Sequence, residues 1–101
     1  MSKVELDLNN PTFLDEFFNL EKVEYFALKG TFKLIRQLEW EQLYTIDGLN
    51  WEKIESKTTT KGHNLYSFRF SNKYRATAYR DDDYLVMVNL HVDHDSAYKK
   101  K

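Results

Sequence analysis

The chain has 101 residues and a formal net charge of −1, with 15 Lys and Arg residues against 16 Asp and Glu residues. Its apolar content of 42%, of which aromatic residues are a large part, excludes a disordered chain, and the absence of cysteine excludes disulfides and thiolate metal ligands. No run of about 18 apolar residues and no apolar signal-peptide core is present, so we expect a single cytoplasmic domain over residues 1–101 with no membrane span.

The N-terminal half predicts one strand followed by two or three helices. Residues 3–8 alternate polar and apolar side chains, which is the pattern of a short strand with one buried face. Asn10 is a favourable N-cap and Pro11 a favourable first helical residue for a helix that extends to about residue 20. Helical periodicity then continues from 21 to 46, and Gly30 predicts a break that divides it into helices over 21–29 and 31–46.

The C-terminal half predicts an antiparallel meander. We expect residues 49–54 to form a short connection on the core and residues 56–64 to form a polar loop. Three runs rich in aromatic and β-branched residues follow, over 65–70, 74–80 and 84–90, and short polar turns separate them. The predicted fold class is therefore α+β, with an N-terminal strand, two or three helices, and a three-stranded antiparallel meander covered by helices on one face.

Positive charge is concentrated between residues 56 and 80. This block contains no carboxylate and six basic residues, which are Lys57, Lys61, Arg69, Lys73, Arg75 and Arg80. Cross-strand charge pairs normally intersperse both signs, so a block without acids favours a site for a polyanion such as RNA over a solvated sheet surface.

Strand periodicity separates the side chains of the meander into two faces. The aromatic side chains of Tyr66, Phe68 and Phe70 share one face, which the helices must cover. Arg69 then lies on the open face. Arg75 joins it if the small Ala76 and Ala78 meet a helix. In the last strand we group Leu85, Met87, Asn89 and His91 together, which brings His91 out at the end of the open face.

Residues 91–98 contain the densest group of proton-transfer side chains, including His91, His94 and Tyr98. A histidine with an ordinary pKa near 6.5 suits either an acid or a base. The same stretch, with Asp93 and Asp95, also offers imidazole and carboxylate ligands to a metal, but its spacing matches no standard structural-zinc pattern. A simple polar strand end is the third reading, and the residues alone do not decide among the three.

The ordered motifs of the C-terminal half resemble the RelE/ParE superfamily of bacterial toxins. They are Leu65-Tyr66-Ser67-Phe68-Arg69-Phe70, Lys73-Tyr74-Arg75-Ala76, and the segment from Asp83 to His91 with Tyr98 beyond it. The resemblance covers about residues 49–98. It departs from the family pattern at Ser67, where ribosome-dependent members often have a second lysine or arginine.

The resemblance implies a metal-independent mRNA endoribonuclease, free or on the ribosome, that needs no cofactor and is inhibited by a cognate antitoxin. It places Arg69 and Arg75 at phosphate-stabilising positions, and His91, His94 and Tyr98 at positions for proton transfer. In the same reading, basic and polar residues of the block contact the substrate, and these are Lys57, Lys61, His63 and Lys73. The alternative is a non-catalytic protein on the same scaffold that binds a protein target, as gyrase poisons do.

Overall fold

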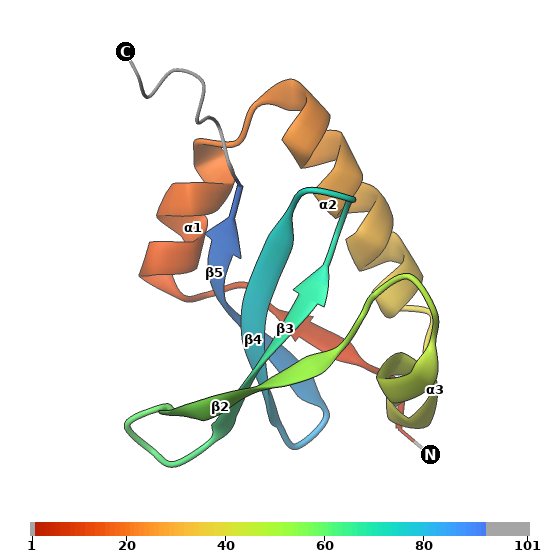
Figure 1. Ribbon diagram of the computed structural model, residues 1–101, viewed down its shortest axis with the longest axis vertical. Helices are drawn as coiled ribbons and strands as arrows, with labels where there is room; N and C mark the ends of the chain where they lie inside the picture. The colour runs from red at the N-terminus through yellow and green to blue at the C-terminus, as the bar shows by residue number, and fades with distance from the viewer. Residues whose placement is uncertain (1, 93–101) are drawn as a thin grey trace.

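The computed structural model describes residues 2–92, which form a five-stranded sheet with three helices (Figure 1). The elements in chain order are β1 (Glu5–Asp7), α1 (Pro11–Phe18), α2 (Lys22–Ile35), α3 (Trp40–Thr45), β2 (Glu52–Thr58), β3 (Asn64–Arg69), β4 (Arg75–Asp81) and β5 (Tyr84–His91). The strand order is β1-β5-β4-β3-β2. The β1–β5 pair is parallel, and the β5–β4, β4–β3 and β3–β2 pairs are antiparallel.

The hydrophobic core lies between one face of this sheet and the helices, and all three helices contribute side chains to it. Strand register aligns Phe68 with Ala76, and Ala76 with Leu90, so these three side chains share a face. The buried cluster contains Phe13 from α1, Leu28, Phe32 and Ile35 from α2, Trp40 and Leu43 from α3, and Phe68, Phe70, Ala76, Ala78, Leu85, Met87 and Leu90 from the sheet side. The predicted α+β class with helices on one face is confirmed, and we call the other face the open face.

The helices begin and end partly as predicted. The Asn10 side chain accepts a hydrogen bond from the Phe13 amide, and Pro11 is the first residue of α1. The predicted break at Gly30 is wrong, because α2 continues through this exposed position, where nothing lies within 4 Å of an added Cβ. The chain instead leaves the helix after Ile35, and a capping box centred on Glu39 starts α3. Within residues 2–92 no helix is long and apolar enough to cross a membrane.

The sheet contains one strand more than predicted, in addition to β1 and the three strands of the meander. Residues 52–58, expected as parts of a connection and a loop, form β2 and pair antiparallel with β3. The pairing register shifts between Lys53 and Thr58, and the strand has one open edge. An irregular edge strand made mainly of polar residues has no regular apolar alternation, which explains why its sequence resembles a loop.

A β-bulge in β5 corrects the predicted faces of the last strand. Register pairs Thr77 with Asn89 but Ala78 with Met87, so Val88 is an extra residue on β5. Before the bulge, Leu85 and Met87 are fully buried in the core and do not lie on the open face as expected. After the bulge the alternation is reversed, and the side chains of Asn89 and His91 lie on the open face.

Candidate active site

The strand register brings the two predicted arginines and His91 into one line across three strands. Arg69 on β3 is directly opposite Arg75 on β4, and Arg75 is directly opposite His91 on β5. Directly opposite residues have Cβ atoms about 5 Å apart and project from the same face. We call Arg69, Arg75 and His91 the cationic row.

A second row of short polar side chains supports the first. Ser67 is opposite Thr77, one pleat further along the open face. The Arg75 guanidinium donates from Nη2 to Ser67 Oγ at 2.8 Å, and His91 Nε2 lies 2.7 Å from Thr77 Oγ1. Each of these two long side chains thus leans diagonally across the sheet onto a hydroxyl, which restricts its rotamers.

Glu16 of α1 fixes the end of β5 from which His91 projects. The Leu90 amide donates to Glu16 Oε1 at 2.7 Å, and Asn89 Nδ2 donates to Glu16 Oε2 at 3.4 Å. The neighbouring strand β1 pairs only with Tyr84, Leu85 and Val86, so it does not supply partners for this part of the β5 edge. The carboxylate therefore takes the place of a strand and docks α1 beside the end of β5 (Figure 1).

A cavity of about 650 Å³ opens between α1 and the adjacent ends of β4 and β5. Cationic and apolar side chains lie on its sheet side, and the acidic side chains of α1 lie on its helix side together with the two residues that follow α1. Its lining consists of Lys73, Arg75, Leu90, His91 and Val92 on the sheet side and Asp15, Glu16, Asn19 and Leu20 on the helix side. The volume is in the range of small-molecule sites and is sufficient for a nucleotide-sized ligand.

The cationic row is not free of acids, which corrects the inference drawn from the charge block. Glu52 of β2 is opposite Ser67, and its Oε1 lies 3.7 Å from Arg75 Nη2. Glu52 lies just before the basic block of residues 56–80 in the sequence, and the added strand β2 brings its carboxylate to the same face. Within residues 2–92, the Arg69 side chain makes no ion pair and no hydrogen bond. One arginine is therefore paired and the other is available.

We expect Glu52→Gln to increase the affinity of the protein for an RNA backbone. The Glu52 side chain is 63% exposed, so its pair with Arg75 is screened and contributes about 1 kcal/mol at most. Its removal then strengthens anion binding by up to about fivefold. The measurement is fluorescence anisotropy with a 2′-O-methyl oligonucleotide, which cannot be cleaved by attack of a 2′-hydroxyl. Glu55→Gln on the same strand is the control, and an equal gain in both variants would show a general charge effect.

The predicted substrate-binding residues are dispersed around this row. Lys73, in the turn between β3 and β4, lines the cavity. Lys57 is exposed on the edge strand β2, and Lys61 is exposed in the loop that follows. These two lysines do not line the cavity.

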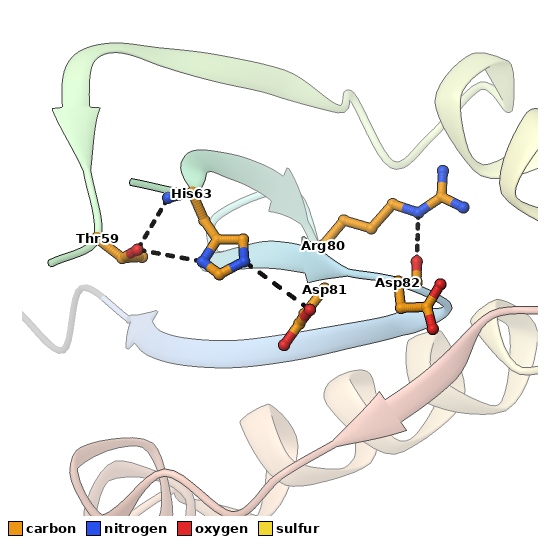
Figure 2. A network of polar contacts seen from close by, with 5 residues as sticks. All are labelled: Thr59, His63, Arg80, Asp81 and Asp82. Atoms are coloured by element: carbon orange, nitrogen blue, oxygen red, sulfur yellow. Dashed lines mark hydrogen bonds and ion pairs between the residues drawn. The ribbon is translucent and has the colours of Figure 1, made fainter. Parts of the chain in front are cut away.

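His63 folds onto the open face but away from the cavity. Its ring stacks on Tyr79 of β4 with centroids 4.7 Å apart, and its Nε2 lies 3.9 Å from Asp81 Oδ1. Figure 2 shows the loop side of this contact, where the Thr59 hydroxyl accepts from the His63 amide at 3.0 Å and also lies near the ring. Tyr79 is four residues from Arg75, or roughly 13 Å along the strand, so the structure does not bring His63 into the cationic row.

The other two predicted proton-transfer residues, His94 and Tyr98, lie outside the described residues, as does most of the alternative metal motif. Among residues 2–92, no group of three or more His, Cys, Asp or Glu side chains is arranged to hold a metal ion. The cationic row is dominated by guanidinium groups, which are not metal ligands. Its chemistry is that of anion binding beside one imidazole.

Two solved structures share this arrangement of elements. A chain of the archaeal RelE–RelB complex from Pyrococcus horikoshii OT3 aligns with a TM-score of 0.64 over 93% of this chain and 99% of that chain, at 14% identity. This is the RelE fold. The YoeB dimer from Staphylococcus aureus aligns with a TM-score of 0.56 over 92% of this chain and 100% of that chain, at 13% identity. No protein-family model and no curated protein sequence matches the chain.

Within this RelE-type fold, three residues of the site escaped the sequence reasoning. They are Glu16, which holds the end of β5, Glu52, which pairs with Arg75, and Thr77, which contacts His91. Glu16 and Glu52 come from elements distant in sequence, so their positions depend on the tertiary structure. Thr77 carried a usable signal, because it alternates with Arg75 on the same strand and therefore shares its face.

Proposed function

We propose that this protein is a toxin-type endoribonuclease that cleaves mRNA without a metal ion. The observation that carries the proposal is the cationic row, in which Arg75 and His91 face each other and line one cavity. We place the activity in the cytoplasm and assign residues 1–101 to a single RelE-like domain. The RelE-type fold, which the chain shares with the structures of the RelE–RelB complex and the YoeB dimer, supports the toxin class implied by the sequence motifs.

The proposed reaction is attack of a ribose 2′-oxygen on the adjacent phosphorus. The bond from phosphorus to the 5′-oxygen breaks, and the products are a 2′,3′-cyclic phosphate and a 5′-hydroxyl. A base removes the proton of the 2′-hydroxyl, and an acid protonates the departing 5′-oxygen. His91 supplies one of these transfers, and His94 and Tyr98 are the proposed sources of the other.

The arginines act on the phosphate. Negative charge accumulates on the non-bridging oxygens in the transition state, and preorganised cations beside them lower the barrier. Arg75 is held by Ser67 Oγ and lines the cavity, while Arg69 stands next to it in the row. A guanidinium suits this role because its planar fork of N–H donors matches two phosphate oxygens. Lys73 adds positive charge to the cavity lining, and Lys57, Lys61 and His63 are proposed to contact the flanking nucleotides.

The test is cleavage of a defined mRNA by the purified protein in the presence of excess chelator, with and without ribosomes. Cleavage that survives the chelator and leaves a 2′,3′-cyclic phosphate end supports the proposal. Products that require a divalent cation contradict it. Absence of cleavage under both conditions, with growth unaffected by expression, favours the alternative of a non-catalytic protein that binds a protein target.

An antitoxin is the proposed protein partner, and the helical layer offers a surface for it. RelE of Pyrococcus horikoshii is found in complex with RelB. Here Phe18 and Phe26 are 77% and 53% exposed, and a groove of about 210 Å³ lies beside them. The groove is lined by apolar and cationic side chains, which are Leu8, Phe17, Tyr25, Phe32, Lys29, Lys33 and Arg36. An apolar groove with a positive rim fits an amphipathic helix with acidic flanks.

We expect the double variant Lys29→Glu/Lys33→Glu to bind its antitoxin at least about tenfold more weakly, because reversed charges on the rim repel an acidic partner. The antitoxin is taken as the product of a short acidic reading frame next to the gene, and the measurement is isothermal titration calorimetry. Lys53→Glu, exposed on the edge strand β2, is the control for reversed charge elsewhere. Unchanged affinity in the double variant would show that the antitoxin binds another surface.

A further inference from the structure

His91 makes a contact through one ring nitrogen that determines which nitrogen faces the cavity. Its Nε2 is 2.7 Å from Thr77 Oγ1, and the contact is partly buried, since Thr77 is only 7% exposed while His91 itself is exposed. His91 lines the cavity, and among residues 2–92 its ring has a hydrogen-bond partner at Nε2 alone, so Nδ1 is the ring nitrogen available to a ligand. We propose that Thr77 is a positioning residue that holds Nε2–H of His91 and leaves Nδ1 to exchange protons with the substrate.

The direction of the hydrogen bond follows from what an acid–base residue must do. In the imidazolium form both ring nitrogens carry protons, so the Thr77 hydroxyl has to accept from Nε2–H. If the proton then leaves from Nδ1, the contact with Thr77 is unchanged and no group has to rotate. If it left from Nε2, the Thr77 hydroxyl would have to turn and become the donor. Exchange at Nδ1 therefore involves the least rearrangement of this contact.

The backbone explains why Thr77 can reach His91. Thr77 is directly opposite Asn89, so His91 is its diagonal neighbour across β4 and β5. Diagonal neighbours are close enough for a long side chain to reach a short one. The bulge at Val88 and the bond from the Leu90 amide to Glu16 fix the end of β5, which keeps the imidazole beside the hydroxyl. A branched, stiff threonine holds its hydroxyl in one direction better than serine does.

The test separates this inference from the proposed ribonuclease activity, on which its catalytic part rests. Long-range ¹H–¹⁵N NMR across a pH titration of the full protein shows which nitrogen of His91 loses its proton. We expect Nε2 to keep its proton and Nδ1 to lose it, and we expect Thr77→Val to convert the neutral ring to a mixture of tautomers. A neutral wild-type ring protonated at Nδ1, or a Thr77→Val spectrum identical to wild type, overturns the inference whether or not the protein cleaves RNA.

Single-turnover cleavage gives the second readout. We expect Thr77→Val to lower the rate constant about tenfold, less than the full contribution of an acid or base, and to leave the Kd for a 2′-O-methyl oligonucleotide unchanged. Thr77→Ser restores the hydroxyl and should cleave within about threefold of wild type. Thr45→Val, exposed on α3, is the matched control. Equal rates for Thr77→Val and wild type, or a loss that Thr77→Ser does not restore, overturn the positioning role. Failure of the wild-type protein to cleave overturns the proposed function and the catalytic part of this inference, and the NMR titration then decides the rest.

Discussion

Arg75→Ala will lower the rate constant for RNA cleavage by about 10²–10³-fold, the loss typical of removing one preorganised donor from a developing oxyanion. Arg75 lines the cavity, and its Nη2 donates to Ser67 Oγ at 2.8 Å, so the guanidinium is preorganised before the substrate binds. His91→Ala will produce a loss of about 10²–10⁴-fold, because general acid–base catalysis contributes this much. Single-turnover kinetics at saturating protein measure both.

The two variants should differ in binding. Arg75→Ala removes a cation that also attracts the ground-state phosphate, whereas His91→Ala should leave affinity for a 2′-O-methyl oligonucleotide nearly unchanged. Lys22→Ala, which removes one exposed positive charge at the start of α2, is the control and should cleave like the wild type. Cleavage at the wild-type rate by Arg75→Ala would remove the cationic row from the chemistry, whatever its effect on affinity.

Arg75→Lys tests whether the guanidinium or only its charge is needed. A lysine keeps the charge but presents a single ammonium group. In the wild type, Nη2 of Arg75 donates a hydrogen bond to Ser67, and the other N–H groups of the guanidinium are available to the phosphate. A lysine cannot do both in a fixed geometry, so we expect a rate between those of the wild type and Arg75→Ala. This ordering distinguishes a positioned donor from a simple increase in local positive potential.

The parts of the fold that were predictable from sequence are those with local causes. The Asn10–Pro11 start of α1 depends on side chains that contact their own helix. The β3–β4–β5 meander depends on strong strand propensity and on short turns, and Asp82 adopts a positive φ of 60° in the last of these turns, as an aspartate in a hairpin turn can. The face shared by Arg69 and Arg75 follows from simple alternation in two regular strands.

The features that escaped prediction depend on tertiary contacts. Strand β2 is an irregular polar edge, and it is recognisable only from its pairing with β3. The bulge at Val88 adds one residue without any glycine or proline to mark it, and one added residue is sufficient to exchange the two faces of a strand. The continuous α2 shows that packing of Leu28, Phe32 and Ile35 outweighs the cost of about 1 kcal/mol for Gly30.

The site was predictable to the same degree as the strands that carry it. Alternation placed Arg69 and Arg75 together, but His91 reaches their face for a reason different from the one inferred, since the bulge reverses the alternation before Asn89. The basic block contains no acidic residue in the sequence, but in the structure Glu52 lies beside Arg75. Glu52 comes from β2, a strand that was not predicted. The distribution of charge along a chain therefore predicts the charge of a site on a sheet only when the neighbouring strands are known.

Trp40→Ala will lower the free energy of unfolding by about 3–5 kcal/mol, which is a large share of the total for a domain of this size. The Trp40 side chain is 2% exposed and belongs to the core. Its Nε1–H donates to the Asp83 carbonyl at 3.1 Å, and the same carbonyl accepts from the Glu5 amide at 3.0 Å. The Arg80 guanidinium carbon lies 4.3 Å from the ring centroid. One indole therefore joins α3, the β4–β5 turn and β1.

Equilibrium urea unfolding followed by far-UV circular dichroism measures this loss, and two further variants divide it into its causes. Trp40→Phe keeps an aromatic ring but removes the N–H donor, so it should lose at least about 1 kcal/mol. Phe18→Ala removes an aromatic ring that is 77% exposed and should stay within about 0.5 kcal/mol of wild type. If Trp40→Ala were no more destabilising than Phe18→Ala, the junction of α3 with the sheet would not depend on this indole. If Trp40→Phe alone accounted for the whole loss, the features specific to the indole, its N–H donor and its larger ring, and not burial of an aromatic ring as such, would hold the junction.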